Sequence, residues 1–233
     1  MKIKILLKRI YLFFLKLITA FIIVSVFFVV LYRFIPPPVT PLMIIRLAEN
    51  VAEGDFKFRK DWEPIKNISP NLIMAVIASE DQNFVSHFGL DFDAIEKARG
   101  YNSRKKGKKI RGASTITQQT AKNLFLWPGR SWLRKGFEVY FTLLIEIFWT
   151  KKRIMEVYLN IIEMGDGIYG AEAASMAYFN KGAGRLTISE AALMAASLPN
   201  PRRWSPVNPT NYLTHRQRWI IKNINNLPKP DFL

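Results

Sequence analysis

The 233-residue sequence contains no cysteine and only two histidines, His87 and His215. Disulfide bonds, thiolate zinc sites and cysteine nucleophiles are therefore excluded, and a metal site built from histidines is disfavoured. Acidic residues are missing from two stretches: the first 33 residues, and the segment between Glu96 and Glu138. The chain as a whole has 34 Lys and Arg against 18 Asp and Glu, a net charge of +16. This excess points to a polyanionic partner, which can be a nucleic acid, an anionic membrane or a phosphorylated substrate.

A long apolar run lies near the N-terminus, from Ile10 to Tyr32, and only Lys16 interrupts it. A helix of this length crosses a hydrocarbon core of roughly 30 Å. Bases cluster before the run, so the N-terminus is expected to stay in the cytoplasm and the rest of the chain to be exported. A cleaved signal peptide is the alternative, but its apolar region is usually about 7–15 residues long. No small-residue cleavage site follows the run, which favours an uncleaved anchor.

The chain is therefore expected to divide into four parts. The segment "PPPVTP" cannot extend the membrane helix and is typical of a stiff linker. The parts are a cytoplasmic basic tail (1–9), a transmembrane signal anchor (10–32), a linker (33–45) and an exported domain (46–233).

Helical patterns dominate the exported domain. Ser69 followed by Pro70 is typical of a helix start, and Thr187 and Glu190 have the spacing of a capping box at the start of another helix. Alternation of the strand type is scarce. A mainly α domain is predicted.

The stretch "GASTITQQTAKNLFL" at 112–126 combines a helical pattern with many uncharged hydrogen-bonding groups. Thr115 and Gln118 have capping-box spacing, so a helix is expected from about Ser114 to Leu126. Its start offers free N–H groups to an anion, and Lys122 adds a full charge. An ordinary polar helix face is the alternative. The residues expected on one face are Thr115, Gln118, Gln119 and Lys122, opposite Ile116, Thr120 and Leu124.

This stretch resembles the "STITQQ…KN" motif of the peptidoglycan glycosyltransferases, a family that polymerises lipid II into glycan strands. Four further motifs resemble those of the family, in the same order, and together they cover about residues 65–210. They are "EDQNFVSHFGLD" (80–91), "RKGFE" (134–138), "KKRIMEVYLNIIEMGDGIYGAEAASMAYFNK" (151–181) and "AALMAASLPNPRRWSPVNP" (191–209). The resemblance implies a lysozyme-like glycosyltransferase domain behind a single N-terminal transmembrane helix. It is closer to the monofunctional members than to class A penicillin-binding proteins, whose transpeptidase has no room in this chain.

The resemblance implies roles for two glutamates. Glu80 is implied to be the general base, which takes the proton from the 4-hydroxyl of the acceptor sugar. Its place at the end of an apolar helix disfavours its charge, as suits a base. Glu138 matches a second glutamate thought to orient groups or bind a cation, and it can also form an ion pair with Arg134 one turn back. Asp81 is expected to organise the site.

Cations are implied to hold the diphosphate of the donor. A lipid diphosphate leaves as an anion, so positive charge can replace a general acid. Cleavage between two sugars instead requires an acid for the leaving group. The matching cations are Lys122, Arg130, Arg134 and Lys135, and the candidates for hydrogen bonds to sugar or phosphate are Ser114, Gln118, Gln119 and Asn123. A divalent cation, Mg or Mn, that bridges the diphosphate stays open.

The partners implied by the resemblance are lipid II, the growing glycan strand and membrane lipid, at the periplasmic side of a bacterial inner membrane. Other proteins of cell-wall synthesis or division stay open, and no nucleic acid is expected. Trp127, Trp132 and Phe125, beside several bases, are candidates for the bilayer interface. His87 is expected to be structural, and Tyr158 to buttress the fold. The rival functions are a membrane-anchored muramidase or lytic transglycosylase, and a non-enzymatic anchored scaffold.

Overall fold

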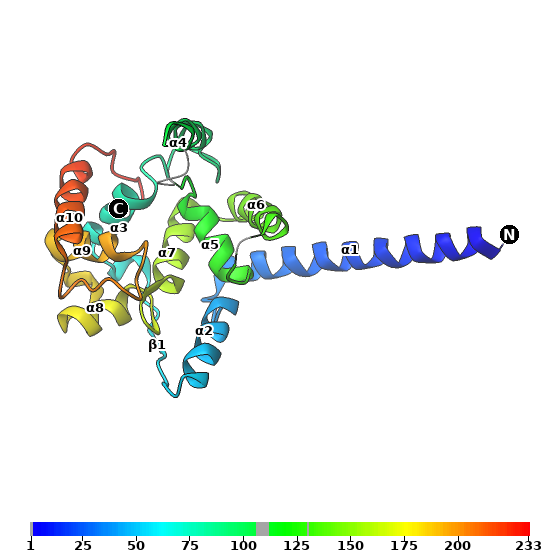
Figure 1. Cartoon of the computed structure of the whole chain (residues 1–233), viewed down its shortest axis with the longest axis horizontal. Coiled ribbons are helices and arrows are strands. Elements are labelled where there is room, and N and C mark those ends of the chain that lie inside the picture. The colour runs from blue at the N-terminus through cyan, green and yellow to red at the C-terminus, as the bar shows by residue number, and fades with distance from the viewer. Residues whose placement is uncertain (1, 106–111, 130) are drawn as a thin grey trace. The chain divides into compact units, whose positions relative to one another are not determined.

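The computed structural model describes residues 2–105, 112–129 and 131–233 of the chain, and most of these residues are helical (Figure 1). Strands in the described residues are only two or three residues long. The prediction of a mainly α fold is confirmed. The helices are α1 (Lys2–Phe34), α2 (Pro41–Ala52), α3 (Pro70–Glu80), α4 (Phe92–Arg104), α5 (Ile116–Phe125), α6 (Trp132–Phe148), α7 (Lys151–Ile161), α8 (Ala171–Phe179), α9 (Ile188–Ser197) and α10 (Asn211–Ile224). The strands are β1 (Arg59–Lys60), β2 (Glu163–Gly165) and β3 (Ile168–Tyr169), and the 3₁₀ turns are Ile65–Asn67 and Ala183–Arg185.

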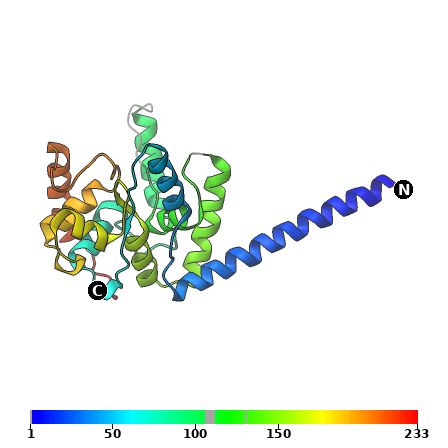
Figure 2. The ribbon, with the colours of Figure 1, turned by 90° about the horizontal axis from the view of Figure 1, so that it is seen from below.

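The chain forms two structural units, and the first, residues 1–36, is built around α1. Its segment Ile3–Phe34 is long and apolar enough to cross a membrane, and Figure 2 shows α1 as one continuous helix. The helix is thus consistent with a single-pass membrane anchor. It begins before the predicted span of 10–32, because the leucines and lysines that precede Ile10 are good helix formers.

The second unit, residues 37–233, begins earlier than the predicted domain boundary at residue 46. Thr40 caps α2 by accepting a hydrogen bond from the backbone N–H of Met43, and Pro41 occupies the first helical position. Met43 is fully buried. A capped helix with a buried side chain thus starts at Pro41, within the segment that was predicted as a linker over 33–45.

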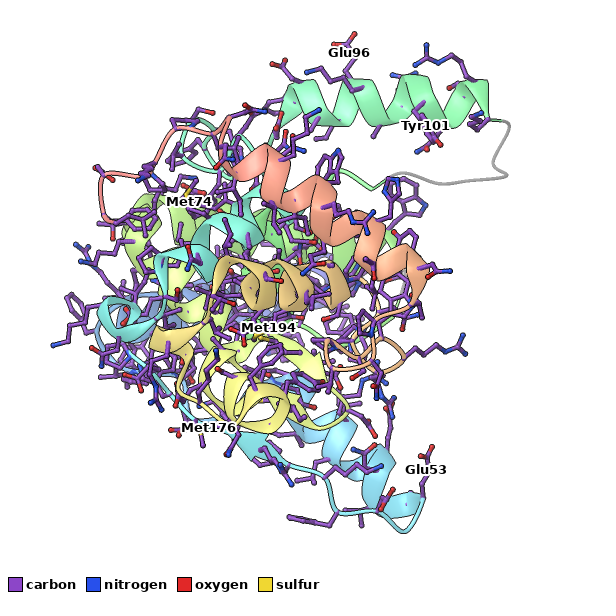
Figure 3. The ribbon with its side chains drawn as sticks, turned by 90° about the vertical axis from the view of Figure 1, so that its left-hand side faces the viewer. Glu53, Met74, Glu96, Tyr101, Met176 and Met194 are labelled. Atoms are coloured by element: carbon purple, nitrogen blue, oxygen red, sulfur yellow. The ribbon has the colours of Figure 1, made fainter. Side chains whose placement is uncertain are left out.

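The centre of the second unit is α3, in which every residue from Leu72 to Ala78 is buried. A helix that is apolar all round needs neighbours on every side, and α3 packs on α9 and α10. The alanines of α9 let these helices approach closely; those that are buried are Ala191, Ala192, Ala195 and Ala196. Met74 of α3 and Met194 of α9 are buried in this packing, whereas Met176 of α8 is exposed (Figure 3).

A second group of helices is formed by α5, α6 and α7, with α5 packed on both of the others. A buried ion pair joins all three helices. Oε1 of Glu146 on α6 accepts hydrogen bonds from Thr117 Oγ1 on α5, at 2.6 Å, and from Lys151 Nζ on α7, at 2.7 Å. These contacts fix the three helices relative to one another, and with them the relative positions of the polar residues on α5 and α6.

The small sheet has the strand order β1-β3-β2, with β1 parallel and β2 antiparallel to β3. Gly167 lies between β2 and β3 with a φ of +68°, and a Cβ atom there would lie 2.5 Å from the carbonyl oxygen of Lys57. Only glycine fits this turn without a shift of the backbone. The sheet thereby ties the segment before α3 to the segment between α7 and α8.

Candidate active site

Glu80 is the last residue of α3, and its side chain is 14% exposed. Its Oε2 accepts a hydrogen bond from Gln119 Nε2 at 3.1 Å, and its Oε1 accepts one from Ser79 Oγ at 3.0 Å. Arg216 of α10 places a guanidinium nitrogen 3.8 Å from Oε1 and also donates to Ser79 Oγ at 3.0 Å. The carboxylate thus ends an apolar helix, as predicted, and polar groups of α3, α5 and α10 contact it.

The segment after Glu80 holds the start of α5. Asp81 is buried, and its carboxylate contacts His87 Nε2 at 2.9 and 3.0 Å and accepts the backbone N–H of Ile116 at 2.9 Å. Thr115 donates its hydroxyl to the carbonyl oxygen of Gly89 at 2.6 Å. Asp81 thus contacts both His87 and the first residue of α5, which fits an organising role for Asp81 and a structural role for His87.

The capping box predicted for α5 is confirmed, and it uses side chains that were expected to meet a ligand. Thr115 Oγ1 accepts from the backbone N–H of Gln118, and Gln118 Oε1 accepts from the backbone N–H of Thr115. Some of the backbone N–H groups expected to bind an anion therefore already have acceptors. The N–H of Ile116 donates to Asp81, and the N–H of Gln118 donates to Thr115 Oγ1. An anion site at the very start of α5 is not supported.

The predicted polar face of α5 is only partly open. Gln118 is 3% exposed and Asn123 is 4% exposed. The cap uses Gln118, and Asn123 is buried on α5. Gln119 and Lys122 are half-buried, and Ser114 is exposed just before the cap.

The predicted cations gather around Glu138 on α6. Glu138 is 3% exposed, and its Oε2 accepts from Arg134 at 2.7 Å while its Oε1 contacts Lys135. Burial lowers the pKa of the Lys122 ammonium. The negative charges of Glu138 and Glu80 act to raise this pKa, and the positive charges of Arg134 and Lys135 act to lower it further. Both carboxylates are therefore close enough to Lys122 to act on its charge. Arg130 lies outside the described residues.

The assembled site has an excess of positive charge. Lys122, Arg134 and Lys135 face two carboxylates, and Arg216 adds a further cation. The Nε atoms of Arg134 and Arg216 are buried and lack a hydrogen-bond partner among the described residues. Buried donors without acceptors are costly, so these atoms are suited to receive oxygens of an anionic ligand.

The donor set does not fit a divalent cation held by the protein. Each oxygen of Glu138 already contacts a cation, and the described residues contain no group of three or more Asp, Glu, His or Cys side chains arranged for a metal. We therefore derive no step through a metal.

Arg216 and Ser79 are site residues that sequence reasoning missed. Arg216 lies outside the segment 65–210 that carries the family motifs, and a lone arginine on a C-terminal helix gives no signal of its own. The apolar pattern of α3 explained Ser79 as an ordinary helical residue. Only the packing of α10 on α3 brings the two side chains together.

The aromatic residues expected at a bilayer interface fall into two groups. Trp132 is 93% exposed and Trp127 is 44% exposed. Phe125 instead stacks on Phe141, with ring centroids 4.5 Å apart and an interplanar angle of 9°. Phe125 therefore supports the contact of α5 with α6, whereas the two tryptophans are open at the surface.

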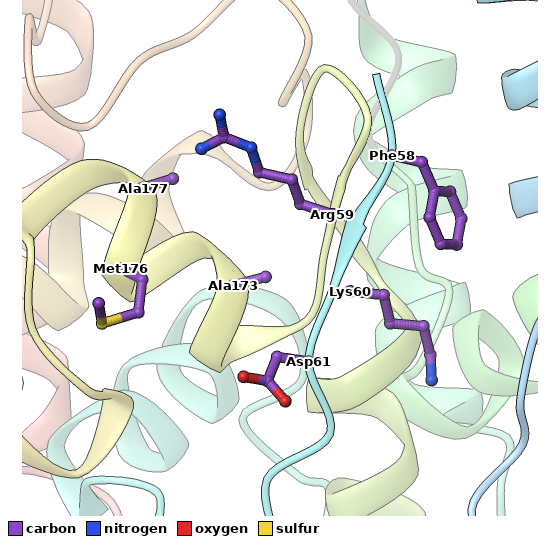
Figure 4. Close-up of a pocket in the computed structure, with 7 residues that line it drawn as sticks. All are labelled: Phe58, Arg59, Lys60, Asp61, Ala173, Met176 and Ala177. Carbon is purple, nitrogen blue, oxygen red and sulfur yellow. The ribbon is translucent and has the colours of Figure 1, made fainter. Parts of the chain in front are cut away.

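A surface pocket of about 490 Å³ lies elsewhere, between β1 and α8 (Figure 4). It is lined by Phe58, Arg59, Lys60, Asp61, Ala173, Met176 and Ala177. It contains none of the candidate site residues described above. The candidate site is thus defined by the chemistry of its side chains rather than by this pocket.

Comparison with known proteins agrees with this geometry. The family model described as Transglycosylase matches residues 48–225. A biosynthetic peptidoglycan transglycosylase of Bdellovibrio bacteriovorus is 54% identical over 210 residues, covering 90% of this chain and 83% of that protein. Proteins of the same name from Bacteroides thetaiotaomicron (56% identical over 202 residues, 86% of this chain and 81% of that protein) and Pseudomonas putida strain GB-1 (50% over 210 residues, 90% and 88%) are similar to it. On the length of the match and these identities, the chain belongs to the transglycosylase family.

Proposed function

We propose that the chain is a peptidoglycan glycosyltransferase that elongates glycan strands from lipid II. The growing strand is transferred from its undecaprenyl diphosphate to the sugar 4-hydroxyl of the next lipid II, and undecaprenyl diphosphate is released. Membership of the transglycosylase family and the names of the relatives support synthesis of peptidoglycan. The observation that carries the chemical proposal is one carboxylate, Glu80, beside a cluster of cations.

Glu80 is the general base of this proposal. Its carboxylate is partly exposed at the end of α3, so an acceptor hydroxyl can reach it. Hydrogen bonds from Gln119 and Ser79 hold the two oxygens in place. A positioned base removes the hydroxyl proton as the new glycosidic bond forms and typically contributes about 10²–10⁴-fold in rate.

Lys122, Arg134 and Lys135 stabilise the leaving diphosphate. The bond from the donor sugar to the diphosphate breaks with its electron pair on a phosphate oxygen, so negative charge develops there and nearby cations lower the barrier. Arg134 offers a planar fork that matches phosphate oxygens, and its Nε is buried without a partner. Glu138 keeps Arg134 and Lys135 in place through its two ion pairs.

The arrangement fits a lytic enzyme less well. Hydrolysis between two sugars needs a carboxyl that can give a proton to the leaving sugar. Both oxygens of Glu138 pair with cations, so this second carboxylate already serves to hold Arg134 and Lys135. Names of relatives that describe biosynthesis point the same way.

The proposed location is a bacterial inner membrane, which α1 crosses once with the N-terminus in the cytoplasm. Trp127 and Trp132 are exposed and can enter the interface of the same membrane, which brings a lipid-linked substrate to the site. Lipid II, the growing strand and membrane lipid are then the partners. Contacts with other proteins of cell-wall synthesis or division stay a prediction.

Purified, detergent-solubilised protein with lipid II tests the proposal. Growth of a glycan polymer with release of undecaprenyl diphosphate is the expected result. Shortening of existing glycan without use of lipid II would support the lytic alternative, and binding without turnover would support a scaffold.

A further inference from the structure

Tyr158 on α7 has no exposed surface, and its hydroxyl donates a hydrogen bond to Gln119 Oε1 at 3.2 Å. Burial raises the pKa of the Tyr158 hydroxyl well above its ordinary value, and the charges of Glu80 and Asp81 raise it further. The hydroxyl thus keeps its proton at every pH at which the protein works. The hydroxyl is therefore always a hydrogen-bond donor, and only the side chain of Gln119 separates it from the proposed base.

Gln119 lies between this donor and Glu80. Its Oε1 accepts from Tyr158, and its Nε2 donates to Glu80 Oε2 at 3.1 Å. If the carboxamide were turned over, its oxygen would meet the carboxylate of Glu80 and its NH₂ group would meet the Tyr158 hydroxyl. Two acceptors would then face each other in a poorly solvated place, which is unfavourable.

We propose that Tyr158 is a positioning residue for Glu80 that acts through Gln119. The inference rests on the proposed role of Glu80 as general base. By holding Gln119 Oε1, Tyr158 keeps the N–H of the amide directed at the carboxylate. A hydrogen bond donated to a carboxylate favours its ionised form, the form that can accept a proton.

The role appears when Glu80 gains a proton. A free amide could turn and accept that proton in a hydrogen bond, which would stabilise the protonated and inactive form. The fixed amide cannot do so. Tyr158 therefore extends the activity of Glu80 to lower pH, whereas packing alone would not affect the pH dependence. The other charged groups that act on Glu80 are Arg216 of α10 and Lys122 of α5, and Tyr158→Phe leaves both in the protein.

The chain offers a matched control in Tyr178. Tyr178 lies in α8, and its hydroxyl donates to the carbonyl oxygen of Met164 in β2 at 3.1 Å. Glu80 is not among the charges that act on Tyr178. Burial raises the pKa of the Tyr178 hydroxyl as well. A Tyr→Phe change removes one hydroxyl and one hydrogen bond at either position.

The test is steady-state turnover of lipid II as a function of pH. Tyr158→Phe is expected to lower kcat about 3- to 10-fold with little change in KM, as suits the loss of one hydrogen bond. The acid limb of its pH–rate profile should move to higher pH. Tyr178→Phe should leave the limb where it is in the unchanged protein.

A double-mutant cycle with Gln119→Ala asks whether Tyr158 acts through Gln119. In the Gln119→Ala protein, Tyr158→Phe is expected to have no further effect. Full additivity of the two changes, or an unmoved acid limb in Tyr158→Phe, would overturn the inference. If Tyr158→Phe does not fold, 3-fluorotyrosine at position 158 replaces it: a stronger donor should move the limb to lower pH, and an unmoved limb contradicts the inference.

The outcomes separate this inference from the proposed function. An unchanged protein that does not turn over lipid II, or a folded Glu80→Gln protein that does, contradicts the proposed function. If Glu80→Gln loses turnover but the acid limb of the pH–rate profile does not move in Tyr158→Phe, only the role of Tyr158 is contradicted.

Discussion

The carboxylate of Asp81 accepts the backbone N–H of Ile116 at 2.9 Å, so the residue after Glu80 holds the first residue of α5. The end of α3, which carries Glu80, and the start of α5, which carries Gln119 and Lys122, are thereby fixed to each other. One buried side chain thus sets the relation between the proposed base and the proposed anion site.

Asp81→Asn tests this relation. The amide has one acceptor oxygen and an NH₂ group in place of two acceptor oxygens, so the backbone N–H of Ile116 and Nε2 of His87 must compete for a single acceptor. We expect a loss of about 1–3 kcal/mol in the free energy of unfolding and turnover at least about 10-fold lower. Thermal unfolding and lipid II turnover measure the two effects. Asp93→Asn is the control, because Asp93 is exposed and should change neither quantity.

Lys122→Met should lower activity and raise stability. The diphosphate loses a cation, so kcat/KM should fall about 10-fold or more. Because burial lowers the pKa of Lys122 in the folded protein, the unfolded chain binds this proton more tightly, and the charge destabilises the fold at neutral pH. The melting temperature of Lys122→Met should therefore exceed that of the unchanged protein at pH 7.

The pH dependence checks the sign of this argument. As pH rises toward the ordinary pKa of lysine, Lys122 loses its charge and the destabilisation disappears. The advantage of Lys122→Met should shrink accordingly. Lys222→Met, at an exposed position, should show neither effect. A melting temperature of Lys122→Met below that of the unchanged protein at pH 7 would refute the argument.

Arg134 should be sensitive even to lysine. Arg134→Ala should lose about 10-fold or more in kcat/KM, and Arg134→Lys should lose activity as well, because an ammonium lacks the planar fork of the guanidinium. The control is the C-terminal end of α4, where Arg104→Gln and Lys105→Gln, the latter at the residue after the helix, remove exposed charges. We expect these to matter less. If activity did not depend on Arg134 but did depend on Arg104 and Lys105, the diphosphate would bind elsewhere.

The anchor gives a topological prediction. A reporter fused after Leu233 should be active outside the cytoplasm, and the mature protein should retain its N-terminus. N-terminal sequencing checks the second point, and a protein that begins near Arg33 would show a cleaved signal. Removal of residues 1–35 should leave the second unit folded, since that unit begins at Pro37, but less active on lipid II in membranes.

The features that could be predicted from the sequence are the helix caps, which depend on residues close together in the sequence. The capping boxes of α5 and α9 and the Ser69 cap of α3 depend on residues two or three positions apart, and the structure contains all of them. Capping chemistry also bears on the predicted polar face of α5. A polar side chain at the third position of a helix can serve the cap or a ligand, and Gln118 serves the cap.

Contacts between distant segments could not be predicted in this way. Arg216 meets Ser79 across 137 residues, and Tyr158 meets Gln119 across 39. Both contacts depend on which helices pack together, and no local pattern contains that information. The family motifs identified Glu80, Gln119 and the cations of α6, but the contacts that orient Glu80 became visible only in the packed structure.

The most direct test of the account is turnover of purified lipid II by Glu80→Gln. The substitution keeps the size of the side chain and removes its ability to accept a proton, while the cations of α5 and α6 stay in place. We predict an unchanged melting temperature and polymer formation at least about 10²-fold slower than in the unchanged protein. A folded Glu80→Gln protein that forms glycan polymer and releases undecaprenyl diphosphate at a near-normal rate would contradict the account.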